Sequence, residues 1–188
     1  IGKNGETLAV KSIGTPIEGK KKEVIPVTLI MPIHSVRGSS KNYLEAACFC
    51  GDTPDWILGD MLITKGDTDK SLKDKANKQK ADTDYALEIL SGCTGDAANA
   101  YRKWLEKDHH DDKTLLENID ALTETSRIAF IYKDKYVHDD PEIQAAWDAT
   151  FMKQISKGIV IQSAVTGEKA VAQAVSPNIK QSALIGGM

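Results

Sequence analysis

The sequence has no long hydrophobic run. Its longest apolar stretch, Val24 to Ile33, is interrupted by Pro26, Thr28 and Pro32, and it falls far short of the ~20 residues that a membrane-spanning helix needs. The opening residues 1–5 also lack the apolar segment of a secretory signal. We therefore expect a cytoplasmic protein with no membrane partner.

Cysteine is scarce and odd in number, with only Cys48, Cys50 and Cys93 in 188 residues. A disulfide framework normally pairs its cysteines in a short secreted chain. A metal site built on Cys48 and Cys50 would need two further ligands at suitable spacing, and the sequence offers none. The pattern predicts reduced, mostly buried thiols.

Motifs for catalysis are missing as well. There is no Gly-rich phosphate loop, and Ser35 and Cys48 do not lie in a strand–elbow–helix sequence such as Gly-x-Ser-x-Gly. The run Asp108 to Asp112 contains two histidines, but adjacent side chains point in different directions and rarely enclose one ion. An exposed turn between helices is the favoured interpretation of that run. We expect no enzyme, cofactor or metal; a small metal-dependent nuclease is the catalytic alternative.

Charge is distributed unevenly along the chain. The net charge is -3, yet residues 1–80 hold 13 Lys and Arg against 10 Asp and Glu, whereas residues 81–188 hold 11 against 17. A contact with a polyanion is therefore more plausible in the first half. Lys20-Lys21-Lys22 could take part only electrostatically, and a solvated loop is its simpler interpretation.

The first part of the chain is predicted to be rich in strands. Residues 1–10 read as a hairpin around Lys3-Asn4-Gly5, with 7–10 as the returning strand. Val24 to Met31 is apolar and β-branched, which predicts a buried strand. A small, polar and basic loop then leads into a strand over Tyr43 to Cys50, with Gly51-Asp52 closing the pair.

Helical periodicity dominates the middle. Residues 65–80 carry six lysines and three aspartates, which is typical of a solvated helix start or a mobile linker. Apolar positions then recur at helical spacing between Ala86 and Leu122. This spacing places Trp104 in the core, whereas Trp56, beside Asp55, is freer to stack on a base.

Strands return near the end. A hairpin over Arg127 to Val137 turns at Lys133-Asp134, and Asp140 with Pro141 begins a helix that places Trp147 in the core. Two more strands follow, at 159–161 and 170–175. The sequence predicts an α+β fold, a mixed or antiparallel sheet with a small helical lobe inserted in the middle. Its regions are 1–64 (β-rich), 65–125 (helical lobe) and 126–188 (completing the sheet).

Several short motifs occur together in the last third. In order, they are Tyr136-Val137-His138-Asp139-Asp140-Pro141, Ala146-Trp147, Val165-Thr166-Gly167-Glu168 and Ser176-Pro177-Asn178-Ile179-Lys180. In order and spacing the chain resembles the N-terminal region of the large subunit of type I-C CRISPR interference (Cascade) complexes, a Csd-type protein. Ser39 to Leu44 and Trp56 to Gly59 resemble two upstream segments of the same family. Without an initiator Met, and ending Gly186-Gly187-Met188, the chain is expected to be a piece of a longer protein.

The resemblance implies a non-catalytic subunit that binds target duplex DNA at the protospacer-adjacent motif and helps to open its strands. Its partners would be double-stranded DNA, other CRISPR subunits and guide RNA. Phosphate contacts need Lys or Arg, and base-edge contacts need Asn, Gln, Ser or Arg. Two clusters hold both kinds, and their candidate residues are Arg37, Ser39, Ser40, Lys41, Asn42, Asn178, Lys180 and Gln181. The alternative is a protein–protein docking domain of the same complex, with no DNA contact of its own.

Overall fold

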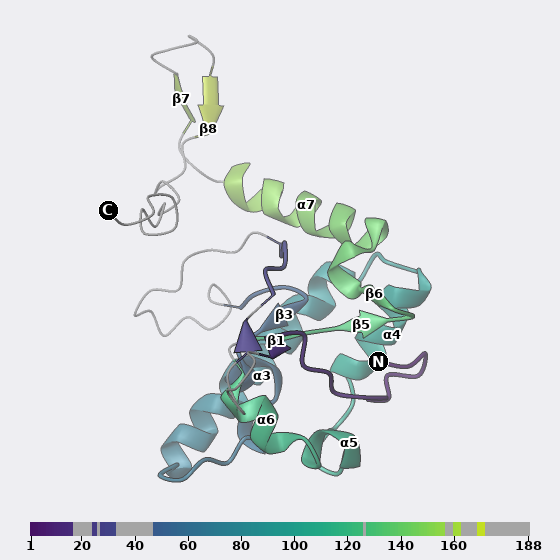
Figure 1. The fold of residues 1–188 in the computed structure, drawn as a ribbon. Coiled ribbons are helices and arrows are strands. Elements are labelled where there is room, and N and C mark those ends of the chain that lie inside the picture. Colours follow the sequence, from purple (N-terminus) through teal and green to yellow (C-terminus); the bar gives the residue numbers. More distant parts are fainter. Residues whose placement is uncertain are drawn as a thin grey trace, which may run out of the picture. The chain divides into compact units, whose positions relative to one another are not determined.

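The computed structural model describes residues 1–16, 24–25, 27–32, 47–125, 127–156, 160–162 and 169–171. The chain divides into two compact units, Ile1–Trp147 and Asp148–Met188 (Figure 1). The three regions expected from the sequence, with boundaries at 64/65 and 125/126, stay a prediction.

Strands in the first unit are short and paired two by two. The described strands are β1 (Thr15–Pro16), β2 (Val24–Ile25), β3 (Gly51–Asp52), β4 (Ile128–Ala129), β5 (Ile131–Tyr132) and β6 (Lys135–Tyr136). All pairs are antiparallel: β1 with β2, β3 with β4, and β5 with β6. Together with the helices, they confirm the predicted α+β class.

Helices form most of the first unit. They are α2 (Pro54–Ile57), the 3₁₀ turn η1 (Gly59–Met61), α3 (Asp69–Leu90), α4 (Asp96–Leu105), α5 (Lys113–Leu116), α6 (Ile119–Glu124), the 3₁₀ turn η2 (Val137–Asp139) and α7 (Pro141–Ser156). The long helix α3 packs against α2, η1 and α4. The helical periodicity between Ala86 and Leu122 is confirmed, although the last part of it is split between α5 and α6.

The lysine-rich segment before Lys80 is helical from Asp69 onward. Thr68 and Ser71 form a reciprocal capping box, in which the Thr68 hydroxyl accepts from Ser71 N at 3.3 Å and the Ser71 hydroxyl accepts from Thr68 N at 2.8 Å. This box satisfies two amides that a helix start otherwise leaves without partners. Of the two structures expected for this segment, the helix start is the one observed.

Of two strands predicted within the first 31 residues, one is not formed and the other is much shortened. The turn of the expected N-terminal hairpin exists, with Gly5 at a φ of 74°, but residues 7–10 are irregular. In the expected strand Val24 to Met31, only Val24–Ile25 is paired, and Val27 and Ile30 are 47% and 91% exposed. Pro26 and Pro32 cannot donate to a ladder, which limits pairing in this stretch.

The strand expected over Tyr43 to Cys50 is not formed in its described part, residues 47–50. Ala47 to Cys50 are buried but are not in a strand, and Cys50 has a left-handed φ of 60°. The following Gly51-Asp52, expected to close a strand pair, forms β3 instead. Gly51 pairs with Ala129 and Asp52 with Ile128, so this segment ties the middle of the unit to its end.

Aromatic side chains fill two parts of the core. Phe130 lies 4.7 Å from Tyr101 and 4.6 Å from Trp104 between ring centroids, and Trp147 stacks on Phe49 at 5.5 Å. The core positions predicted for Trp104 and Trp147 are therefore confirmed. The interpretation of Trp56 as free to stack on bases is wrong, because this side chain is only 7% exposed and packs with Ala47 and Ala81.

The start of α7 matches its prediction closely. Asp140 Oδ1 accepts hydrogen bonds from the backbone N–H groups of Glu142 at 3.0 Å and Ile143 at 3.3 Å. Pro141 stands at the first helical position, where its missing N–H costs nothing. The preceding hairpin turns at Lys133 and Asp134, both with positive φ. Cap and turn fix where α7 begins.

The second unit contains the end of α7 and one further antiparallel pair, β7 (Val160–Gln162) with β8 (Lys169–Val171). Ile161 faces Ala170 in this register, close to the two strands predicted there. The turn expected at 166–168 lies outside the described residues. Across the described part of the chain, no helix has the length and apolar character to span a membrane.

Candidate binding surfaces

The sequence-predicted DNA contacts do not fall on described parts of the structure. All eight candidates (Arg37, Ser39, Ser40, Lys41, Asn42, Asn178, Lys180 and Gln181) lie outside the described residues, as do Lys20-Lys21-Lys22. They stay predictions from the sequence. The described part of the first unit offers other surfaces.

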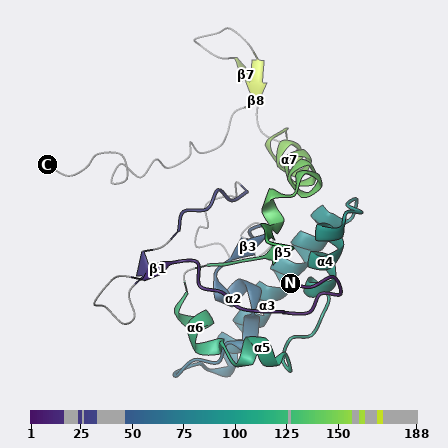
Figure 2. The same cartoon turned by 45° about the vertical axis from the view of Figure 1, so that its right-hand side comes forward.

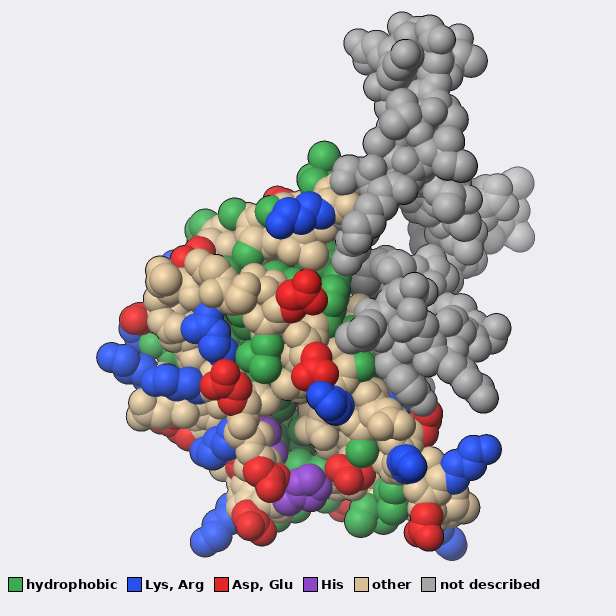
Figure 3. Space-filling view, turned by 180° about the vertical axis from the view of Figure 1, so that it is seen from behind, with side chains coloured by type: hydrophobic (Ala, Val, Ile, Leu, Met, Phe, Trp, Pro, Cys, Tyr) green, Lys and Arg blue, Asp and Glu red, His purple; other side chains and the backbone are tan. Residues whose placement is uncertain are grey.

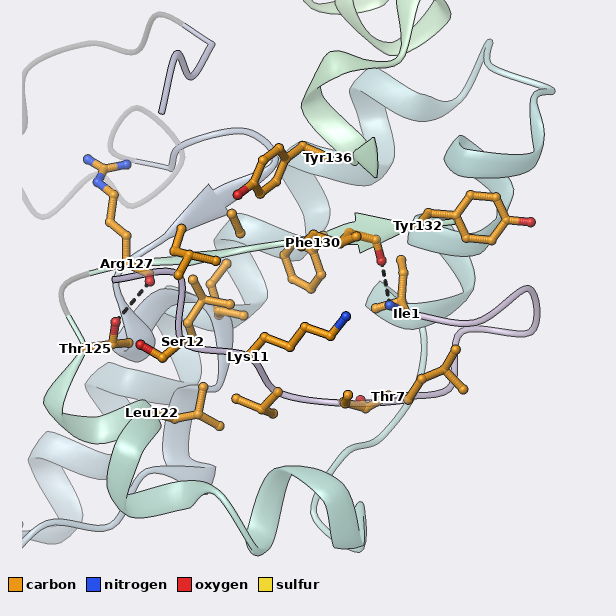
Figure 4. A pocket seen from close by; sticks show the side chains of 18 of the residues that line it. Ile1, Thr7, Lys11, Ser12, Leu122, Thr125, Arg127, Phe130, Tyr132 and Tyr136 are labelled. Carbon is orange, nitrogen blue, oxygen red and sulfur yellow. Dashed lines mark hydrogen bonds between the residues drawn. The ribbon is translucent and has the colours of Figure 1, made fainter. Parts of the chain in front are cut away.

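A large cleft lies in the first unit between its first fourteen residues and the stretch from α6 to β6. Its volume is about 1300 Å³. Residues 1–14 run between the β4–β5 stretch and helices α5 and α6 (Figures 2 and 4). Figure 4 shows Phe130 and Lys11 reaching into the space and Leu122 entering it from α6, whereas Arg127 is directed away.

The lining of the cleft is mostly apolar, and part of it is exposed. Leu8, Ile13 and Val27 all line the cleft and are 65%, 40% and 47% exposed. Isolated exposed apolar side chains are ordinary, but a contiguous group in a concavity is typical of a protein-interaction surface. Charged groups, including Lys11 and Glu124, are interspersed among them.

Specific contacts hold the N-terminal segment beside α4. Trp104 Nε1 donates to Thr7 Oγ1 at 3.1 Å. A side chain at Gly5 would place its Cβ 2.5 Å from the backbone of Lys103 and Trp104, so the close approach of the two backbones requires glycine. These contacts make the wall formed by residues 1–14 part of the folded unit.

The Asp108–Asp112 run is divided between core and surface. His109 is buried, its ring stacks on Trp104 at 4.2 Å between centroids, and its Nε2 lies 2.8 Å from the carbonyl oxygen of Trp104. The exposed position expected for His109 is therefore wrong. His110 is exposed, with Nδ1 2.7 Å from Asp108 Oδ1 and Nε2 3.3 Å from Asp60 Oδ1. The Asp108 carboxylate, which accepts a hydrogen bond from the His110 ring, raises the pKa of His110 above its ordinary value.

In the view of Figure 3, histidine side chains lie beside carboxylates in the lower part of the molecular surface. Beside them lies a small cavity of about 220 Å³, lined by α3, η1 and residues 105–110. In the described part of the chain, no group of three or more His, Cys, Asp or Glu side chains is placed to hold a metal ion.

The three cysteines are buried free thiols, as the sequence predicted. Burial raises the pKa of Cys50 and of Cys93 above the ordinary thiol value, with nearby carboxylates adding to the effect. The reactive form of a cysteine is the thiolate. These environments therefore disfavour nucleophilic chemistry at both positions.

A comparison with protein families decides what kind of chain this is. The family model described as CRISPR-associated protein (Cas_Csd1) matches residues 1–185. The chain belongs to the Csd1 family. No curated protein and no solved structure matches it.

Family membership confirms the resemblance drawn from the motifs of this Csd1 chain. Within the described residues, those motifs are architectural. Asp140 and Pro141 begin α7, and Ala146-Trp147 lies inside that helix, where Trp147 is a core residue. The described motifs thus belong to the architecture of the fold, whereas Val165-Thr166-Gly167-Glu168 and Ser176-Pro177-Asn178-Ile179-Lys180 lie outside the described residues.

Sequence reasoning missed the cleft of this Csd1 chain. Its lining comes from segments more than a hundred residues apart, such as Leu8 and Phe130, and no local pattern brings them together. The local signal that the sequence does offer is the apolar pair Leu8 and Val10, which the pattern assigns to a returning strand over residues 7–10.

Proposed function

We propose that this chain is a non-catalytic subunit of a type I-C CRISPR surveillance complex that contacts target duplex DNA at the protospacer-adjacent motif and aids strand opening. The observation that carries the proposal is the Csd1 family match over residues 1–185. The basic excess of residues 1–80 supports a polyanion contact in the first half. Its partners would be the other complex subunits, guide RNA and target DNA, in the cytoplasm.

The division of labour follows from the chemistry of such complexes. Guide–target pairing reads the sequence, and protein reads only the short motif and the backbone. The loop from Arg37 to Asn42 combines phosphate-binding and base-reading side chains within six residues. We assign Lys41 to phosphate and Asn42 to a base edge of the motif.

The test is a gel-shift titration of the assembled complex carrying Lys41→Ala or Asn42→Ala. Lys41→Ala should weaken binding to all duplexes alike and reduce the slope of log K against log salt by about 1. Asn42→Ala should act mainly on motif choice, by about 1–3 kcal/mol for the contacted base. Lys113→Ala, which removes an exposed lysine on α5, is the matched control. Unchanged binding in both variants would show that this loop does not contact the DNA.

A second candidate function is docking on a neighbouring subunit, and the apolar cleft favours it. Leu8→Asp places a charge in the cleft lining and should reduce co-purification with the complex, whereas Ile30→Asp is the control. Ile30 is 91% exposed and lies outside the cleft lining. Equal recovery of both variants in the complex would count against docking through the cleft.

A further inference from the structure

The exposed face of α3 carries a ridge of cationic and amide side chains. We name this set the α3 ridge; its members are Lys70, Lys73, Asn77 and Lys80, all exposed. Their spacing of three, four and three residues places them on one side of the helix. At 1.5 Å of rise per residue, the ridge is about 15 Å long.

The opposite side of the same helical segment binds its lysines internally. Lys75 is 7% exposed, and its Nζ lies 2.7 Å from Asp67 Oδ2 and 2.7 Å from the carbonyl oxygen of Leu62. Lys78 Nζ lies 3.0 Å from Asp74 and 3.7 Å from Asp55. The carboxylates of Asp55 in α2, Asp67 before α3 and Asp74 in α3 are thereby used by the inward lysines.

Two of the three outward lysines have no ion pair among the described residues. Neither Lys70 nor Lys73 forms an ion pair with another residue of the described segments, and only Lys80 is paired, with Asp84 at 2.7 Å. The inward lysines that hold α3 to the core are thus neutralised, whereas Lys70 and Lys73 face solvent without an ion pair in the described segments. Asp69 and Asp84 stand at the two ends and limit the cationic surface to the stretch between them.

The ridge ends at the small cavity described above. Lys80, Gln79 and Thr83 of α3 line one part of it, and Lys107 and His110 line another. Lys80 thus belongs to both the ridge and the cavity. The carboxylate of Asp108 lines the same space of about 220 Å³ and contacts His110, so the cavity has mixed charge and the uncompensated cations are those of the ridge.

We propose that the α3 ridge binds the sugar–phosphate backbone of a nucleic acid strand. The inference rests on the proposed function and adds to it a contact surface separate from the Arg37–Asn42 loop. Lysine ammonium groups bind phosphates as point charges without reading bases. A length of about 15 Å corresponds to roughly four nucleotides at 3.4 Å of axial rise. The strand is either target DNA or guide RNA, since both present the same backbone chemistry.

The experiment compares two double variants of the assembled complex. Lys70→Gln/Lys73→Gln removes two ridge charges while keeping good helix formers. Lys113→Gln/Lys135→Gln removes two exposed lysines from α5 and β6 and changes the net charge equally. Equal thermal unfolding midpoints establish that both variants fold.

If the strand is duplex target DNA, the ridge variant should bind all sequences about tenfold or more weakly near 0.1 M salt, with the salt slope smaller by about 2. If the strand is guide RNA, the ridge variant should retain less RNA after a high-salt wash, at unchanged DNA affinity per RNA-loaded complex. Either result supports the ridge. Behaviour identical to the control variant in both measurements overturns it.

Including Lys41→Ala in the same titration separates the two proposals. If Lys41→Ala weakens DNA binding while the ridge variant binds both DNA and guide RNA as the control does, the ridge proposal alone is rejected. No effect in either variant, together with equal DNA binding by a complex lacking this subunit, rejects the proposed function as well.

Discussion

Glu142, in the first turn of α7, accepts hydrogen bonds from the backbone N–H of Gly95 at 2.7 Å and of Thr94 at 2.8 Å. One carboxylate thus satisfies amides at the start of α4, where Gly95 itself offers no side-chain cap. These hydrogen bonds lower the pKa of Glu142 below its ordinary value of 4.5. The start of α7 is thereby fixed to the start of α4.

Glu142→Gln should lower the stability of the first unit at neutral pH, because a neutral amide is a weaker acceptor at a helix N-terminus. A carboxyl whose folded pKa is depressed stabilises the fold above its unfolded pKa. That contribution is lost as pH falls from about 4.5 through the folded value. Thermal unfolding midpoints of the two proteins should therefore differ at pH 7 and converge in acid. A constant difference across this range would contradict the assignment.

Lys75→Met should destabilise the fold, since Asp67 would lose its cation and Leu62 a donor to its carbonyl oxygen. Removing one member of a buried pair leaves the other charge uncompensated. We expect the unfolding midpoint to fall by about 5 °C or more. The control is Lys73→Met on the exposed side of the same helix, which should change little. Equal midpoints for both would show that Lys75 contributes no more than a surface lysine.

Trp56→Ala should act on stability, whereas a base-stacking role would change DNA affinity. Replacing a buried Trp by Ala costs about 3–5 kcal/mol because it leaves a cavity. Urea unfolding measures this loss, and Leu116→Ala at a 45% exposed site should cost much less. If Trp56→Phe instead weakens DNA binding at unchanged stability, the side chain has a role beyond the core.

The two histidines His110 and His138 should titrate on opposite sides of the ordinary value of 6.5. The Asp108 carboxylate raises the pKa of His110, and burial lowers that of His138. The stability gained from His110 is fully present below its unfolded pKa and is lost as pH rises through its folded pKa. Proton NMR titration measures both values. Asp108→Asn should bring His110 back toward 6.5 and leave His138 unchanged.

Local chemistry predicted the elements whose determinants are close in sequence. Asp140 and Pro141 define the start of α7, and the periodicity around Tyr101 and Trp104 defines α4. Caps and helical spacing are expressed within a few residues, so they can be read without knowing the fold. The α+β class followed from the same kind of signal.

Features decided by distant partners could not be predicted. The burial of Trp56 depends on α3 lying against α2, and Asp55 beside it suggested exposure. Val27 and Ile30 are apolar and β-branched, which favoured a buried strand, yet the described chain gives them no strand partner. The cleft could not be predicted for the same reason, because residues 8 and 130 come together only in the folded chain.

The contact of residues 5–7 with α4 also constrains the order of folding. The bond between Thr7 and Trp104 closes a separation of 97 residues, whereas α3 and α4 form mainly from near neighbours. Long-range closure costs chain entropy before it gains contacts, so local helices tend to form first. We therefore expect residues 5–7 to dock on α4 late in folding. The cleft then forms only after α4 and β5 are in place. Pulse-labelled hydrogen exchange should find Gly5 and Thr7 amides protected after those of α3; the reverse order would refute this.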